Sequence, residues 1–249
     1  MLTGIAASTT DDAFLGGALV LRQPAKGYRI SSDAVLLAAL TPLRPGQKIL
    51  DLGTGYGQIG LCLLARESGL QVTGLELLPE VAELARHNAT ANGMADRFEV
   101  VCGDVANTRL AGFDIVVCNP PYRKAETHTA SADIIKATAT TENPSVPLQA
   151  WVQTASAALA PKGHLLLIHD AQREGEILDA LEAARLGTVQ ILPLISKAGS
   201  APNRLILNAA HGDVSVVRHP PLVLHEADGK WCQEIERVLR TPLPLECWQ

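Results

Sequence analysis

From residue 47 onward, the spacing of hydrophobic and polar positions alternates between strand-like and helix-like segments. Short apolar runs predict buried strands, and apolar positions at helical spacing predict amphipathic helices between them. The predicted strands cover residues 47–53, 71–77, 97–104, 113–118, 164–170, 188–195 and 204–210. The predicted helices cover residues 58–68, 79–92, 148–161, 173–185 and 230–240.

This alternation predicts an α/β fold with a mostly parallel sheet covered by helices on both faces. The last two predicted strands follow each other without a helix, so we expect an antiparallel pair at one edge. Ligands of such sheets bind beyond the carboxyl ends of the strands. The residues at these ends are Asp51, Glu76, Asp104 and Asn119.

The segment before residue 46 has a different pattern. Residues 15–30 contain two groups of turn residues and predict a hairpin, and residues 31–40 predict a helix that begins at Ser31 or Ser32. Residues 1–13 are small, polar and acidic, so we expect them to be frayed. The predicted organisation is an N-terminal extension, residues 1–45, packed on a core domain of residues 46–249.

Residues 51–60, DLGTGYGQIG, form a glycine-rich loop between a predicted strand and a predicted helix. The pattern Gly55-x-Gly57-x-x-Gly60 matches a dinucleotide-binding fingerprint, which is weak evidence by itself. Asp51 precedes the glycines, and its carboxylate would repel a pyrophosphate but attract an ammonium or sulfonium group. The loop therefore favours a ligand with a cationic end.

Two further acids strengthen this interpretation. Glu76 ends the second strand, where a carboxylate can accept hydrogen bonds from both hydroxyl groups of a ribose. Asp104 ends the third strand, where it can meet the amino group of an adenine. Three carboxylates at neighbouring strand ends suit an adenosine with a cationic tail better than a dinucleotide.

The segments ILDLGTGYGQIGL, VTGLEL and VVCGDV resemble the first three motifs of the class I S-adenosylmethionine-dependent methyltransferases. The resemblance implies a Rossmann-like fold with a seven-stranded sheet of order 3-2-1-4-5-7-6, in which strand 7 is antiparallel. It implies S-adenosyl-L-methionine as the cofactor, with the glycine loop at its methionine part, Glu76 at its ribose and Asp104 with Val105 at its adenine. The implied cofactor-binding residues are Asp51, Gly53, Thr54, Gly55, Gly57, Glu76, Leu77, Asp104, Val105 and Asn119.

The fourth strand ends on a rigid polar corner, Asn119-Pro120-Pro121-Tyr122. The side-chain oxygen of Asn119 and the carbonyl of Pro120 can accept both hydrogens of a planar amino group, which would direct the nitrogen lone pair at a methyl donor. Pro121 keeps both acceptors aimed, and Tyr122 can stack on the substrate. The corner resembles that of amino-methyltransferases acting on adenine N6, guanine N2 or protein glutamine N5.

Segments near both ends of the chain reduce the number of possible substrates. Residues 15–40 and 220–231 resemble the start and the end of the bacterial tRNA(Val) adenine-N6 methyltransferase family, which modifies the adenosine beside the anticodon. This resemblance implies that Tyr28, Arg29 and Asp33 lie over the methionine end of the cofactor or over the target base. Three alternatives stay open: a release-factor type glutamine N5-methyltransferase, a guanine-N2 methyltransferase of ribosomal RNA, and a non-catalytic cofactor-binding or RNA-binding module.

The net charge of −5 weighs against a broad nucleic-acid surface, although a local basic patch can coexist with an acidic remainder. We expect such a patch at the open end of the sheet, as a rim that binds tRNA phosphates. Its members are Arg22, Lys26 and Arg29 in the hairpin segment, and Arg123 and Lys124 after the corner. Residues 123–145 are long and polar, which is typical of a lid ordered by substrate or of a loop that contacts RNA.

The composition, 47% hydrophobic and 19% charged residues over 249 positions, is typical of a globular protein. No apolar run reaches the roughly 18–20 residues that span a bilayer, and the N-terminus lacks the features of a secretory signal. The five cysteines form no CxxC pair, so we expect free thiols, no metal site and a reducing cytoplasm. The sequence is compatible with a monomer or a dimer.

Overall fold

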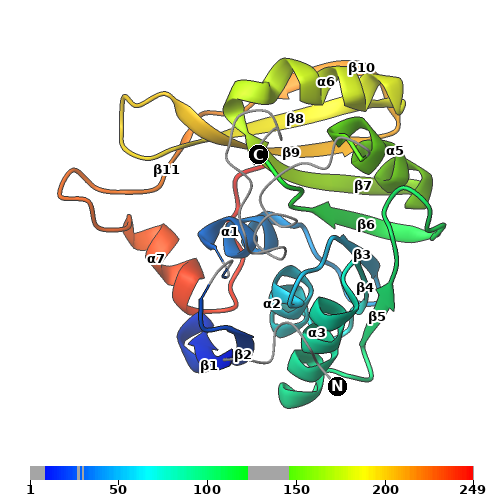
Figure 1. Cartoon of the computed structure of the whole chain (residues 1–249). Coiled ribbons are helices and arrows are strands. Elements are labelled where there is room, and N and C mark those ends of the chain that lie inside the picture. The colour runs from blue at the N-terminus through cyan, green and yellow to red at the C-terminus, as the bar shows by residue number, and fades with distance from the viewer. Residues whose placement is uncertain (1–8, 27–28, 30, 123–145, 249) are drawn as a thin grey trace.

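The computed structural model describes residues 9–26, 29, 31–122 and 146–248. In these residues one large sheet and a separate hairpin account for the strands (Figure 1). The strands of the large sheet are β3 (Lys48–Leu52), β4 (Gln71–Glu76), β5 (Phe98–Cys102), β6 (Phe113–Cys118), β7 (Leu159–Asp170), β8 (Leu186–Ile195), β9 (Pro202–Ala210), β10 (Gly212–Arg218) and β11 (Leu222–Val223). The hairpin consists of β1 (Thr9–Phe14) and β2 (Leu19–Pro24), joined by the 3₁₀ turn η1 (Leu15–Gly17).

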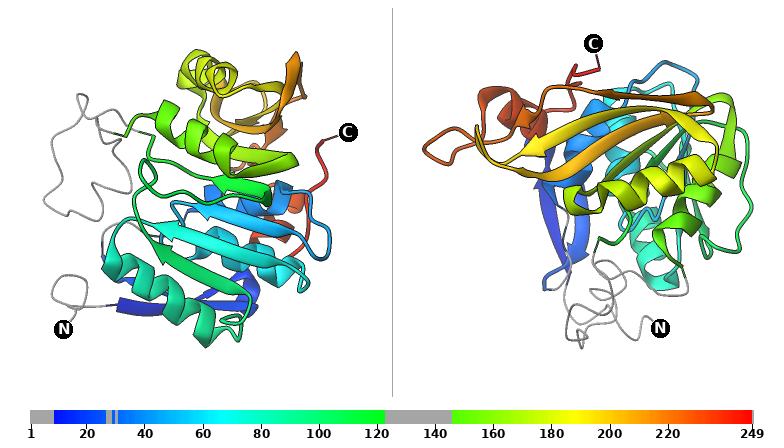
Figure 2. Two further views of the ribbon diagram at one scale, coloured as in Figure 1. Left: turned by 90° about the vertical axis from the view of Figure 1, so that its right-hand side faces the viewer. Right: turned by 90° about the horizontal axis from the view of Figure 1, so that it is seen from above.

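The helices of the described residues cover both faces of this sheet. They are α1 (Ser32–Leu40), α2 (Gln58–Arg66), α3 (Pro79–Ala91), α5 (Leu148–Ala158), α6 (Glu174–Ala183) and α7 (Gln233–Arg240), with a short 3₁₀ turn η3 (Ala171–Arg173) before α6. Figure 2 shows α6 lying over β8 and β9. The α/β fold predicted from the sequence is confirmed.

The large sheet has the strand order β5-β4-β3-β6-β7-β9-β8-β10, and β11 also pairs with β8. β9 runs antiparallel to its neighbours β7 and β8, and the other pairings are parallel. The sequence predicts seven strands, whereas the sheet has nine in the described residues, so the prediction missed β10 and β11. All seven residues of β10 are exposed, so the chain lacks there the one-sided burial pattern that identifies a strand.

The hairpin also differs from the prediction, because its first strand lies in the segment expected to be frayed. β1 pairs antiparallel with β2 from Thr9 opposite Pro24 to Phe14 opposite Leu19. The polar residues of β1 are held by the backbone ladder and by ion pairs, in which Asp11 contacts Arg22. A hydrophobic pattern cannot reveal a strand that is stabilised in this way.

Two hydrophobic cores lie on opposite faces of the sheet. One packs α1, α2 and α3 against residues such as Ile49 and Val117, and the other packs α5 and α6 against residues such as Leu50 and Val116. Successive residues of β3 and β6 therefore enter different cores, as the alternation of side chains along a strand requires. The buried strands consequently consist of nearly continuous apolar runs.

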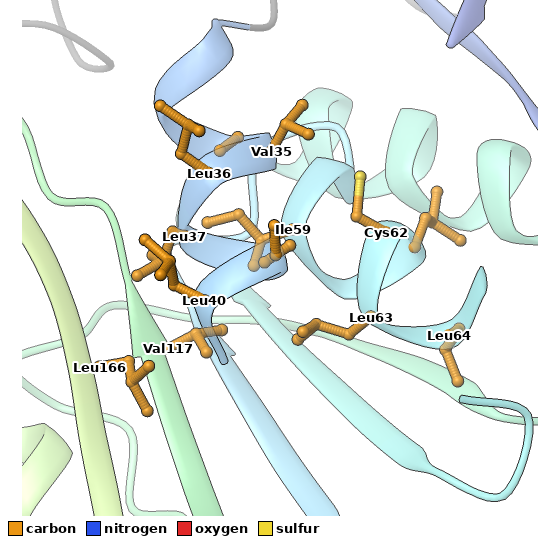
Figure 3. Packing of buried hydrophobic residues seen from close by; sticks show 14 of the residues in the cluster. Val35, Leu36, Leu37, Leu40, Ile59, Cys62, Leu63, Leu64, Val117 and Leu166 are labelled. Atoms are coloured by element: carbon orange, nitrogen blue, oxygen red, sulfur yellow. The ribbon is translucent and has the colours of Figure 1, made fainter. Parts of the chain in front are cut away.

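Helix α1 is buried along almost its whole length, from Ala34 to Leu40. Figure 3 shows Leu37 and Leu40 of α1 beside Val117 and Leu166 of the sheet, with Ile59 of α2 on the same side. The carboxyl-terminal segment closes over this helix, since the indole nitrogen of Trp248 donates to the carbonyl of Leu40 at 2.7 Å. This packing fixes the backbone of α1, and Asp33 lies in the first turn of that helix.

Candidate active site

Four polar side chains follow the carboxyl ends of neighbouring parallel strands. β3 pairs with β4, and Asp51 lies opposite Gly74. β3 also pairs with β6, where Leu52 lies opposite Cys118. β4 pairs with β5, and Glu76 lies opposite Cys102. The ends of β3, β4, β5 and β6 therefore meet at one edge of the sheet. This edge is where an open α/β sheet binds its ligands.

The carboxylate of Asp51 is completely buried. Its Oδ2 accepts hydrogen bonds from the hydroxyl of Thr54 at 2.6 Å and from the backbone N–H of Gly60 at 3.0 Å. These bonds tie the glycine loop to the start of α2. Its Oδ1 is buried with no hydrogen-bond partner in the described part of the chain, and burial raises the pKa of Asp51 to about 6.

The glycine loop turns sharply through left-handed backbone conformations, with φ of 77° at Gly53, 58° at Gly55 and 85° at Gly57. At Gly53 a side chain would also have no room, because a Cβ atom would lie 2.8 Å from the ring of Trp151 in α5. The loop and α5 therefore approach each other as closely as backbone and indole allow. Sequence reasoning did not single out Trp151.

Glu76 holds the glycine loop from the neighbouring strand. Its Oε2 accepts from the N–H of Gly55 and its Oε1 from the N–H of Leu78, each at 3.0 Å. Burial raises the pKa of Glu76, although these backbone donors counteract the effect. The next residue, Leu77, is 45% exposed, which is unusual for a large apolar side chain beside a buried carboxylate.

Asp104 shapes the turn after β5. Its carboxylate accepts from the N–H of Ala106 at 2.9 Å and from the side chain of Asn107 at 3.1 Å. The adjoining Val105 is buried, and its carbonyl accepts a hydrogen bond from Thr154 of α5. The three predicted acids thus lie at three successive strand ends, with α5 alongside.

The rigid corner after β6 forms a compact polar cluster. The hydroxyl of Tyr122 donates to the side-chain oxygen of Asn119 and also lies 3.2 Å from Oδ2 of Asp33, at the start of α1. The structure therefore brings Asp33 into contact with the corner. Strand β6 ends at Cys118, as predicted, so the corner begins at Asn119.

The cluster contains three residues that sequence reasoning missed. The guanidinium of Arg204 lies over the Tyr122 ring at 4.5 Å from its centroid, the ring of His169 meets Tyr122 edge-on at 5.1 Å, and Arg173 donates to the carbonyl of Tyr122 at 3.2 Å. A signal existed for Arg204, because β9 runs antiparallel and its first residues must lie at the carboxyl edge of β7. Arg204 indeed lies opposite Asp170, the last residue of β7.

His169 is fully buried, and neither of its ring nitrogens has a hydrogen-bond partner in the described residues. Burial is the largest cause that lowers the pKa of His169, to about 4, and the neighbouring cation Arg173 adds to the effect. At neutral pH the imidazole is therefore uncharged and acts as a packing surface for Tyr122.

The expected basic rim is only partly visible. Arg22 pairs with Asp11 at 2.7 Å and Arg29 pairs with Asp12 at 2.9 Å, so both cations contact carboxylates. Lys26 is exposed. Tyr28, Arg123 and Lys124, together with the predicted lid of residues 123–145, lie outside the described residues.

The described residues contain no group of three or more His, Cys, Asp or Glu side chains placed to hold a metal ion. Within the same residues, no helix is long and apolar enough to cross a membrane.

The chain is similar to known methyltransferases. The model of the family described as "Methyltransferase small domain" matches residues 30–192. A tRNA1(Val) (adenine(37)-N6)-methyltransferase of Porphyromonas gingivalis is 30% identical over 223 residues, which cover 84% of this chain and 86% of the relative. The enzyme of the same name from Actinobacillus pleuropneumoniae is 27% identical, with 85% of this chain and 89% of the relative covered.

Among solved structures, a predicted O-methyltransferase from Agrobacterium tumefaciens superposes with a TM-score of 0.70. It is 26% identical in sequence, and the match covers 86% of this chain and 98% of that one. A ribosomal protein L11 methylase from Lactobacillus delbrueckii shares the fold at a TM-score of 0.51 and 19% identity.

Proposed function

The chain belongs to the methyltransferase small domain family, and from this we propose that it transfers a methyl group from S-adenosyl-L-methionine to N6 of an adenosine in tRNA. The names of its curated relatives support the tRNA substrate and point to adenosine 37, beside the anticodon. One solved neighbour is described as a predicted O-methyltransferase, but this does not decide which atom accepts the methyl group here, because proteins of one fold can methylate different atoms.

The observation that carries this proposal is the cluster at the corner after β6. An amino group on a purine is planar, and its lone pair is delocalised into the ring, so it is a weak nucleophile. The carboxamide oxygen of Asn119 and the carbonyl of Pro120 would accept its two hydrogens and draw the nitrogen toward a tetrahedral shape. Pro121 restricts the backbone, so both acceptors are oriented before substrate arrives.

The residues at the ends of β3, β4 and β5 fit the cofactor. The partnerless Oδ1 of Asp51 is suited to accept from the ammonium group of its methionine part, and Glu76 is suited to accept from ribose hydroxyls. The exposed side chain of Leu77 is suited to pack on the adenine, and Asp104 and Val105 follow the neighbouring strand β5, where they would also meet the adenine. When bound there, S-adenosyl-L-methionine supplies an electrophilic methyl group.

The remaining work of the chain is positioning. Tyr122 offers an aromatic face on which the target base can stack. No side chain needs to act as a strong base, because the nitrogen becomes acidic once it is methylated and its proton can leave to water. His169 is neutral and has no role as a general acid at neutral pH.

A tRNA partner would also engage the predicted rim of Arg22, Lys26, Arg29, Arg123 and Lys124, and Tyr28 would lie over the methionine end of the cofactor or over the target base. In the free protein Arg22 and Arg29 contact acids, but both pairs are about half exposed and such pairs contribute little free energy. Phosphate groups of RNA could therefore replace Asp11 and Asp12 as partners at small cost.

The direct test is transfer of tritium from labelled S-adenosyl-L-methionine to bulk tRNA. We expect the wild-type protein to label tRNA and Asn119→Ala to lose roughly 100-fold in rate, as is typical when one oriented polar group is removed from an active site. Asn92→Ala, which changes the residue at the end of α3 whose side chain contacts the backbone of Val20 and Asn88, should keep the wild-type rate.

Other outcomes would replace the proposal with one of its alternatives. Label in release factors instead of RNA would indicate a glutamine N5-methyltransferase, and label recovered as N2-methylguanosine would indicate a guanine enzyme. Undiminished labelling by Asn119→Ala would show that the corner is not the active site.

A further inference from the structure

Tyr122 is held by side chains that come from distant parts of the chain. Arg204 of β9 lies over its ring at 4.5 Å, and Asp33 of α1 lies 3.2 Å from its hydroxyl. Asp33 and Arg204 also contact each other, because Nε of Arg204 donates to Oδ2 of Asp33 at 3.1 Å. One carboxylate oxygen thus links the cation above the ring to the hydroxyl at its edge.

The hydroxyl of Tyr122 has one proton and two acceptors within reach, Asn119 and Asp33. In the free protein it donates to the carboxamide oxygen of Asn119, the oxygen that a substrate amino group would need. If the amino group takes that oxygen, the hydroxyl can donate to Asp33 instead. The exchange leaves no polar group without a partner, so it avoids the cost of an unsatisfied buried donor.

The pair of Asp33 and Arg204 is partly shielded from water, with side-chain exposures of 20% and 29%. Burial is the largest single effect and would lower the pKa of Arg204, but Asp33, Tyr122 and Asp170 together outweigh it, so the pKa is raised. The guanidinium of Arg204 therefore stays charged at neutral pH. A planar guanidinium can stack on the ring and donate to the carboxylate at the same time, which a lysine ammonium cannot do equally well.

We propose that Arg204 and Asp33 are positioning residues for Tyr122: Arg204 fixes the ring for stacking on the target base, and Asp33 accepts the hydroxyl once the substrate amino group occupies Asn119. This inference rests on the proposed function, since it describes how the same site receives a planar amino group.

A double-mutant cycle tests whether Arg204 acts through Tyr122. We expect Arg204→Gln to lower the single-turnover rate at saturating tRNA by roughly tenfold, the order of a partly buried cation–π contact. Its dissociation constant for S-adenosyl-L-methionine should stay within about twofold of wild type. Arg204→Lys, which keeps the charge, should recover part of the rate, and in a Tyr122→Ala background Arg204→Gln should have no further effect.

Two controls separate positioning from folding and from the proposed function. Arg240→Gln removes an exposed ion pair in α7 and should leave the rate unchanged. In protein labelled with 3-fluorotyrosine, the three tyrosines give three fluorine resonances, and that of Tyr122 should move toward the resonance of free fluorotyrosine in Arg204→Gln while that of Tyr56 stays in place.

The outcomes are distinct. Equal effects of Arg204→Gln with and without Tyr122, or an unmoved Tyr122 resonance, would overturn the positioning role. A wild-type protein that labels no RNA would overturn the proposed function, and the fluorine spectrum would still decide whether Arg204 holds the ring.

Discussion

Burial of Asp51 at the edge of the sheet disfavours its ionised form and so lowers the stability of the folded protein at neutral pH. Burial raises the pKa of Asp51 from 3.8 to about 6, so the folded protein holds a proton that the unfolded chain has already lost. The stability associated with this proton is complete below the unfolded pKa and is lost as the pH rises through about 6. Such a loss of stability is expected of a buried carboxylate whose charge is compensated only when a cationic ligand binds.

This cost can be measured with Asp51→Asn, which has no carboxyl group to titrate. From pH 4 to pH 7, the free energy of unfolding of the variant should improve relative to wild type by up to about 3 kcal/mol. Urea denaturation without cofactor at several pH values gives this difference. A difference that is constant across the range would contradict the burial of an ionisable carboxyl at this position.

Gly53 offers a second residue-scale test, because both its backbone and its surroundings exclude a side chain. Gly53→Ala should destabilise the protein by more than the roughly 1–2 kcal/mol that a left-handed alanine costs, since its Cβ would lie 2.8 Å from the Trp151 ring. Gly93→Ala is the matched control, because Gly93 has φ of 66° and no atom within 4 Å of the added Cβ. Equal destabilisation by the two variants would show that Trp151 does not pack on the loop.

At the scale of elements, Asn88 joins three of them. This fully buried residue of α3 accepts from the N–H of Arg22 at 2.7 Å, and it donates to the carbonyls of Arg22 and Tyr56 at 3.0 and 2.9 Å. It therefore connects the N-terminal hairpin to the glycine loop through α3. The hairpin is thus linked to the loop that we propose binds the cofactor.

Removal of this connection should cost more than removal of a similar exposed one. Asn88→Ala should lower the free energy of unfolding by about 3 kcal/mol, because one buried and two part-buried backbone groups lose their partner. It should also weaken binding of S-adenosyl-L-methionine. Asn92→Ala, whose side chain contacts Val20 at the exposed end of the hairpin, should cost less than about 1 kcal/mol. Chemical denaturation and calorimetric titration of the cofactor would measure both effects, and equal losses would contradict the proposed link.

The sequence predicted elements well where burial gives a pattern and poorly where it does not. The predicted strand at residues 113–118 coincides with β6, since its residues alternate between two cores. β7 begins at Leu159, five residues before the predicted start at 164. Pro161 and Gly163 are unfavourable in strands, so the sequence pattern does not predict a strand there. β1 and β10 are exposed or polar, and their backbone pairing leaves no hydrophobic signature.

At the scale of the whole molecule, the site is assembled by topology. Asp33, Asp51 and Arg204 come from α1, β3 and β9, and Asn119 directly follows β6. Only the order and direction of these elements in the fold brings the four residues to one edge of the sheet. Single motifs identified the acids and the corner, because each motif lies at one strand end. Asp33 is singled out only through the family resemblance of residues 15–40. No motif could show that it contacts Tyr122 and Arg204, because Asp33 and Arg204 are separated by 171 residues.

The central claim is that N6 of an adenosine in tRNA accepts the methyl group, and it is tested with the whole protein and its RNA. The most direct measurement is mass spectrometry of nucleosides from tRNA incubated with S-adenosyl-L-methionine, with and without the protein. We expect N6-methyladenosine to appear only with the active protein and to be absent with Asn119→Ala. Unchanged tRNA nucleosides, or methylation of any nucleoside other than adenosine, would contradict the account.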